Sequence, residues 1–260
     1  MNNQISAIKA ELLKCRHTKI SLISFIAFSL VPLMSGIFMY MMQDPQMMAN
    51  AGALGAKAEA MNISADWNAL FMIMTQGMGD GGIVIYGFLV SWIFGREYSE
   101  NTLKDLLSLP VSKTKTINAK FTVYALWAIG LGIVNLLLGI IIGLLLRLSG
   151  FDGSACVNSL KVYFFTMVLT ILLGSPVAFF SMLGKGYLAP LGFVVLTVVF
   201  SQIITVLGMG EYFPWAVPAL YSGISGEVIL NAPSYIILTA VSVTGYCGAV
   251  LFWNNTDYGR

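Results

Sequence analysis

Long stretches without a charged residue alternate with short charged segments along the chain. No Asp, Glu, Lys or Arg occurs between Lys19 and Asp44, and only Asp80 interrupts the apolar stretch from Trp67 to Gly95. A helix needs about 20 mostly apolar residues to cross the hydrocarbon core of a bilayer. The pattern predicts six such helices, at residues 20–42, 70–95, 119–146, 162–183, 188–208 and 233–253.

Helices explain these stretches better than strands do. The apolar runs are continuous, as at residues 136–142, whereas a membrane barrel shows alternating segments of about ten residues. The chain is 57% hydrophobic and 10% charged, and soluble domains carry about 25% charged residues. We therefore expect an all-α polytopic membrane protein that forms one transmembrane domain over residues 1–260.

The basic residues predict the orientation in the membrane. With the N-terminus inside, eleven of the fourteen Lys and Arg residues fall in segments 1–19, 96–120, 184–187 and 254–260. Only Lys57, Arg147 and Lys161 fall outside. Because loops on the cytoplasmic side carry the excess of Lys and Arg, we expect both termini in the cytoplasm and a multi-pass protein of the plasma (inner) membrane.

Metal binding and nucleic-acid binding have no support in the sequence. The three cysteines, Cys15, Cys156 and Cys247, are far apart, and His17 is the single histidine. Neither residue type shows the spacing of a metal site or of a disulfide framework. A net charge of +2 gives no basic surface for nucleic acid. We expect membrane lipid as a partner, no nucleic acid, and no metal or cofactor on this chain.

The N-terminal segment, residues 1–19, has the pattern of an amphipathic helix. Ile5, Ile8 and Leu12 recur at helical spacing, and basic residues such as Lys9 and Lys14 lie between them. Such a helix suits the cytoplasmic membrane surface. The alternative is a solvated basic tail.

A second short helix is predicted within the loop 96–120. Leu103, Leu106 and Leu107 form one apolar stripe, and Pro110 ends the helix. The segment is too short and too charged to span a membrane. A leucine stripe on such a helix favours docking into a groove, either in another subunit or at the membrane surface.

The same loop resembles the cytoplasmic loop of ABC-2 type transporter permeases. The matching residues are Glu97, Thr102-Leu103, Leu106, Pro110, Ser112-Lys113 and Lys120. Asn101 stands where the family usually has Gly, and Lys113 where it often has Arg. The segment Tyr212-Phe213-Pro214-Trp215-Ala216-Val217-Pro218 resembles bacitracin- and lantibiotic-type permeases of this family.

The resemblance implies a membrane subunit of an ATP-driven exporter. It places the ATPase-docking contacts on Glu97, Thr102, Leu103, Leu106, Leu107 and Pro110. It also implies two copies of a separate ATPase, which hold ATP and Mg, and pairing with a second permease, identical or related. The chain lacks a P-loop, because Gly184-Lys185 has neither the earlier Gly nor the following Ser or Thr. We therefore expect no enzymatic activity of its own.

An external hairpin is expected at residues 209–232. It contains Pro214, Trp215 and Pro218, and Glu211 and Glu227 flank it. In the family that the chain resembles, such a re-entrant hairpin caps the exit of the transport path. Aromatic anchoring at the membrane interface is the simpler alternative for Trp215.

Three polar residues in the spans are candidates for the translocation path: Asp80, Asn135 and Gln202. Asn135 and Gln202 could instead bond neighbouring helices. Asp80 is functional if it lies at membrane depth. Alternatively it lies at the external mouth, with Trp67–Gln76 a separate external helix. The surrounding glycines permit either a break or close helix packing. Asp80 could also be read as a catalytic acid of an intramembrane aspartyl protease. Such an enzyme needs a second acid, and no other acid lies within a predicted span, so this activity is not expected.

The expected function is export of an amphipathic or lipid-like substrate, such as a peptide antibiotic, out of the cell or membrane. Antibiotic resistance or bacteriocin immunity would be the physiological result. Two alternatives are an ion-coupled secondary transporter and a membrane sensor or assembly module that transports nothing.

Overall fold

The computed structural model describes residues 2–16, 18–52, 64–103, 112–223 and 230–255, and these are almost entirely helical. The elements are α1 (Asn2–Arg16), α2 (Ile20–Gln43), α3 (Pro45–Asn50), α5 (Trp67–Ser99), α7 (Lys113–Leu145), α8 (Gly153–Leu172), α9 (Gly174–Leu183), α10 (Leu188–Val206), η1 (Gly210–Tyr212), α11 (Val217–Tyr221) and α12 (Ala232–Asn255). Within these ranges, six helical stretches, with α8 and α9 taken together, are long and apolar enough to cross a membrane. The predicted all-α polytopic fold is confirmed.

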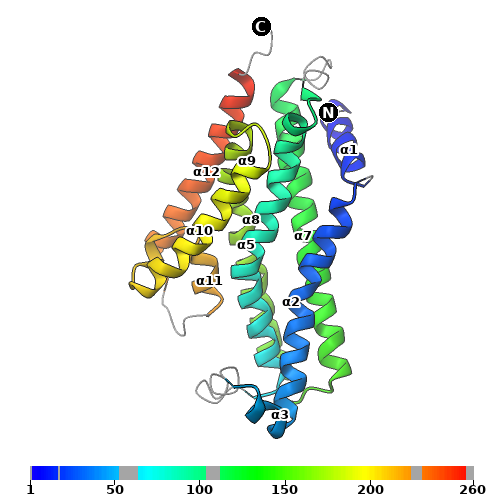
Figure 1. Cartoon of the computed structure of the whole chain (residues 1–260), viewed down its shortest axis with the longest axis vertical. Helices are drawn as coiled ribbons and strands as arrows, with labels where there is room; N and C mark the ends of the chain where they lie inside the picture. Colours follow the sequence, from blue (N-terminus) through cyan, green and yellow to red (C-terminus); the bar gives the residue numbers. More distant parts are fainter. Residues whose placement is uncertain (1, 17, 53–63, 104–111, 224–229, 256–260) are drawn as a thin grey trace.

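Helix α5 lies at the centre of the bundle. It packs against α2, α7, α8, α9 and α10, whereas α2, α10 and α12 leave most of their surface exposed. Figure 1 shows α1 and the last turn of α12 at one end of the bundle, and α3 with the start of α5 at the other. We call these the α1 end and the α3 end.

Of the two arrangements that the sequence left open for the second span, the one with a break is excluded. Helix α5 runs without interruption from Trp67 to Ser99, so Trp67–Gln76 is not a separate helix. The glycines serve close packing instead. Val31 of α2 occupies the space beside Gly77, and the backbone of α11 occupies the space beside Gly79.

Polar caps explain why three helices begin earlier than their apolar runs. The side chains of Asp66, Ser112 and Asp152 accept hydrogen bonds from backbone N–H groups in the first turns of α5, α7 and α8. Such caps satisfy donors that the helix itself leaves unpaired. The fourth span therefore starts at Gly153 rather than near residue 162.

The fourth span is broken between Leu172 and Gly174, two residues before Pro176. The break releases backbone carbonyls that lipid cannot satisfy. Tyr124 donates its hydroxyl to the carbonyl oxygen of Ile171 at 3.0 Å. Ser175 donates to the carbonyl oxygen of Leu172 at 2.9 Å. Side chains thus stabilise the break from within the bundle.

Gly245 sets the approach of α12 to α9. A Cβ at this position would lie 2.5 Å from the backbone nitrogen of Pro176. We expect Gly245→Val to lower the free energy of unfolding by about 1–3 kcal/mol, because overpacking forces the two backbones apart. Thermal unfolding of the purified protein measures this. Gly130→Val is the matched control, since no atom lies within 4 Å of the added Cβ. Equal melting temperatures for the two variants would contradict the assigned packing.

Candidate functional site

Four charged side chains from three helices meet at the α1 end, and we call them the ionic cluster: Glu11, Lys14, Glu97 and Lys120. The amino group of Lys120 lies 2.6 Å from Glu97 and 3.3 Å from Glu11. The amino group of Lys14 lies 2.6 Å from Glu11 and 3.3 Å from Glu97. Each carboxylate therefore contacts both ammonium groups, and the cluster as a whole is neutral.

Three of the four members of the ionic cluster are buried and the side chain of Lys14 is 33% exposed, so the buried charges depend on one another for compensation. Lys120 is 1% exposed, Glu97 3% and Glu11 6%. Lys120 also donates to the backbone carbonyl of Ile93 at 2.8 Å. Removing one member of a buried ion group leaves an uncompensated charge, which costs about 3–5 kcal/mol. The cluster therefore ties α1 and α7 to the last turn of α5.

Helix α5 ends at Ser99, two residues after Glu97, in a Schellman motif. The N–H of Thr102 donates to the carbonyl of Glu97, and the N–H of Asn101 donates to that of Tyr98. Asn101 has a φ of 56°, in the left-handed region that Gly and Asn tolerate best. This explains why Asn can stand where the family usually has Gly. A carboxylate near a helix C-terminus is unfavourable, so Glu97 depends on its two lysines.

The predicted docking residues lie at the base of the loop that follows. Thr102 is exposed, Leu103 is buried, and Glu97 points into the ionic cluster. Leu106, Leu107 and Pro110 lie outside the described residues, so their docking role stays a prediction. No group of three His, Cys, Asp or Glu side chains within the described ranges is placed to hold a metal ion.

The acidic residue of helix α1, Glu11, attaches this helix to α7. It packs on α7 and α2, with Glu11 and Cys15 buried and Lys9 exposed. Burial is the main reason why the pKa of Cys15 rises to about 11, and the charge of Glu11 adds to the effect. At neutral pH this thiol is therefore protonated and poorly reactive.

Residues 207–223, which follow α10, fold back beside the middle of α5, and we call them the folded-back segment. Trp215 is 8% exposed and packs against Phe193 of α10, with ring centroids 5.5 Å apart. Tyr221 packs against Phe165 of α8, with centroids 4.8 Å apart. The indole of Trp215 thus lies inside the protein rather than at its rim. Glu211 accepts a hydrogen bond from Asn231, and Glu227 lies outside the described residues.

This segment touches α5 beside Asp80. A Cβ on Gly79 would lie 2.9 Å from the Cα of Ala219 and from the carbonyl oxygen of Pro218, so only Gly permits this approach. One residue later, the carboxylate of Asp80 accepts a hydrogen bond of 3.4 Å from Gln202 of α10. Asp80 is partly buried and Gln202 is exposed. The structure therefore brings two of the three path candidates, Asp80 and Gln202, together one residue away from the contact of Gly79 with α11.

Asn135 takes the second role that the sequence left open, that of bonding neighbouring helices. It donates to the carbonyl of Phe28 in α2 at 2.9 Å and accepts from the hydroxyl of Tyr163 in α8 at 3.1 Å. Sequence reasoning did not find Tyr163, or the pairing of Glu11 with Lys120. Glu11 is the one acidic residue among the first nineteen, and that was the available signal.

The ionic cluster gives a direct prediction. Lys120→Met keeps an unbranched side chain, one heavy atom shorter than that of lysine, but leaves Glu97 and Glu11 with Lys14 alone. We expect the free energy of unfolding to fall by about 3–5 kcal/mol, measured by thermal unfolding in detergent. Lys115→Met, an exposed lysine of the same helix, is the control. A loss no larger than that of the control would show that the cluster adds no stability.

Labelling of Cys15 separates undocking of α1 from a change of charge alone. The experiment uses Cys156→Ser and Cys247→Ser, so that Cys15 is the remaining thiol. Lys120 lowers the pKa of Cys15, so its removal from an intact site would make maleimide labelling slower. We expect faster labelling instead, because α1 detaches and exposes the thiol. Slower labelling in Lys120→Met would contradict the tethering role.

Comparison with known proteins identifies the family of this chain. A family model described as "ABC-2 family transporter protein" matches residues 7–203. The bacitracin transport permease protein BCRB of Bacillus licheniformis is 28% identical over 182 residues, which cover 68% of this chain and 85% of that protein. The region matched by the family model includes most of α1, the ionic cluster and Asp80. The chain therefore belongs to the ABC-2 family, as a multi-pass membrane subunit of an ABC transporter.

Proposed function

We propose that this subunit exports an amphipathic or lipid-like substrate, such as a peptide antibiotic, from the plasma membrane. The observation that carries the proposal is that α5 makes contacts with two distant parts of the protein. Its last turns hold Glu97 in the ionic cluster, at the base of the loop 96–120, and its middle holds Gly79 against the folded-back segment. One helix therefore contacts both the element expected to meet the ATPase and the element expected to cap the path.

Helix α5 has the stiffness that such a connection needs. Gly79 and Glu97 are 18 residues apart, about 27 Å along a continuous helix. The structure leaves no break between them at which motion could be lost. A shift imposed on the loop would move the last turn of α5, and with it the contact between Gly79 and Ala219. Helix α1 and α7 would follow, because Glu11 and Lys120 hold them to Glu97.

Membership of the family implies association with an ABC ATPase. In our proposal two copies of that separate ATPase bind ATP and Mg, and the leucine-striped segment of the loop 96–120 docks into each. Six spans enclose little space, so a second permease, identical or related, completes the path.

The substrate class rests on the folded-back segment and on the relative. The segment is aromatic and apolar, as suits an amphipathic cargo, and the relative is by name a bacitracin transport permease. An ion-coupled secondary transporter has less support. Within the described spans the acidic residues are Asp80 and Glu97, and Glu97 is neutralised by lysines. No pair of acids at membrane depth remains for proton or sodium coupling.

Leu106→Asp tests both the docking of the ATPase and the dependence of transport on ATP. An aspartate in the apolar contact would be buried without a partner, so we expect loss of copurification with the ATPase. We also expect loss of ATP-dependent uptake of labelled bacitracin into inside-out vesicles. Ser108→Asp, which lies off the leucine stripe, is the control and should keep both. Uptake that persists without the ATPase, driven by an ion gradient, would overturn the proposal.

The proposed orientation, with both termini in the cytoplasm, has its own test. In a chain without native cysteines, Ser154→Cys marks the α3 end and Lys115→Cys the α1 end, and both positions are exposed. We expect a membrane-impermeant maleimide to label Ser154→Cys on intact cells, and Lys115→Cys only after the cells are opened. The reverse labelling pattern would invert the orientation and, with it, the direction of transport.

A further inference from the structure

The break in the fourth span opens a cleft on the outer surface of the bundle. Helix α12 follows α9 closely, because Gly245 admits the backbone of Pro176 and Ser175 donates to the carbonyl of Ser242 at 2.6 Å. It contacts α8 only slightly. Because α12 packs along α9 and makes few contacts with α8, it separates from α8 on the far side of the break. A wedge of space remains between α7, α8 and α12.

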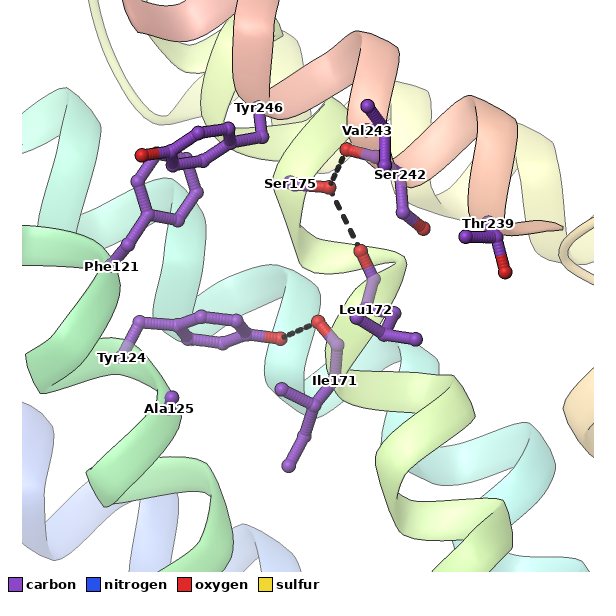
Figure 2. A pocket seen from close by; sticks show the side chains of 10 residues that line it. All are labelled: Phe121, Tyr124, Ala125, Ile171, Leu172, Ser175, Thr239, Ser242, Val243 and Tyr246. Atoms are coloured by element: carbon purple, nitrogen blue, oxygen red, sulfur yellow. Dashed lines mark hydrogen bonds between the residues drawn. The ribbon is translucent and has the colours of Figure 1, made fainter. Parts of the chain in front are cut away.

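The wedge is a defined cleft of about 340 Å³, within the size range of small-molecule sites. Figure 2 shows its walls. Phe121, Tyr124 and Ala125 come from α7, Ile171 and Leu172 from α8, Ser175 from α9, and Thr239, Ser242, Val243 and Tyr246 from α12. Val243 is 55% exposed, so the cleft opens at the outer surface of the bundle.

The surface that the cleft presents is hydrocarbon. The hydroxyl of Tyr124 is held by the carbonyl of Ile171, and that of Ser175 by the carbonyls of Leu172 and Ser242, as the dashed lines in Figure 2 mark. These groups stabilise the helix break and offer little to a ligand. The hydroxyl of Ser242 is buried without a hydrogen-bond partner among the described residues.

We propose that this cleft binds one acyl chain of a membrane phospholipid. The walls belong to three membrane-spanning helices, so the medium at its opening is lipid rather than water. An empty wedge would forfeit the dispersion contacts of its lining, and a flexible hydrocarbon chain restores them. The proposal depends on the membrane environment alone and does not rest on the export function.

The rim at the α1 end fits the polar part of the same lipid. Phe121 lies eight residues, about 12 Å, from Lys113 at the start of α7. The amino group of Lys113 lies beside the end of α12, where it donates to the carbonyl of Asn254. Between the two levels, Tyr246 and Asn118 share a hydrogen bond of 2.9 Å. A chain in the cleft therefore places its headgroup near a cation and several polar groups.

The test uses the full chain in nanodiscs that contain a phosphatidylglycerol with a diazirine in one acyl chain. The protein is then moved into detergent, which strips loosely held lipid, and is illuminated. We expect adducts on residues 121–125 and 239–246, located by mass spectrometry. Ala125→Phe should reduce these adducts by about tenfold, because a ring and a lipid chain cannot share the volume. Gly130→Phe, on the same helix but facing open space, should leave them unchanged.

Val243→Trp is a second variant that fills the cleft from α12, at an exposed position that tolerates a larger side chain. It should also abolish the adducts. Ser242→Ala should leave them unchanged, since a hydrocarbon chain does not hydrogen-bond. Loss of labelling in Ser242→Ala would overturn the assignment to an acyl chain. So would absence of adducts in the cleft, their persistence in both filled variants, or displacement of the probe by bacitracin but not by phospholipid.

Discussion

Hydrocarbon offers no hydrogen bonds, and this constraint shapes most of the structure. Every backbone group within the membrane must find its partner inside the protein. Unbroken helices meet the requirement by themselves. Where the fourth span breaks, Tyr124 and Ser175 supply donors to the released carbonyls. Asn135 and Tyr163 likewise satisfy each other and two backbone carbonyls, and in doing so they join α2, α7 and α8.

The same constraint explains why the buried charges occur together. Lys120 is fully enclosed, and water cannot compensate it, so two carboxylates do. One comes from α1, which precedes the first span, and the other from the last turn of α5. The cluster therefore fixes an otherwise peripheral helix to the point where the central helix leaves the bundle. In the proposed mechanism this position matters, because a force on the loop 96–120 would act first on the turn of α5 that carries Glu97.

The membrane spans were predictable from sequence because a charge inside hydrocarbon is costly, and the gaps between charges therefore mark them. Helix ends were less predictable, since Asp66, Ser112 and Asp152 extend helices beyond the apolar runs. The sequence left open whether the glycines near Gly77 interrupt the second span or let it pack closely, because the neighbours of those glycines could not be known. Glycine marks close approach and chain breaks equally, and only the packing partner decides between them.

The candidate site was predictable only in part. The base of the loop could be located from local spacing, and Glu97 and Lys120 from the family resemblance. That Glu11 joins them depends on a contact between residues 109 positions apart, which no local pattern encodes. The cleft was missed for a similar reason, since it exists only because α12 follows α9 rather than α8.

The spans differ greatly in length, and this has a consequence for the host membrane. Helix α10 has 19 residues, about 28 Å, whereas α5 and α7 have 33 each, about 50 Å. The long helices can tilt or protrude when bilayer thickness changes, but α10 has no additional length with which to span a thicker bilayer. Thicker membranes must therefore thin around α10, and lipid chain length becomes a variable that acts on one side of the bundle only.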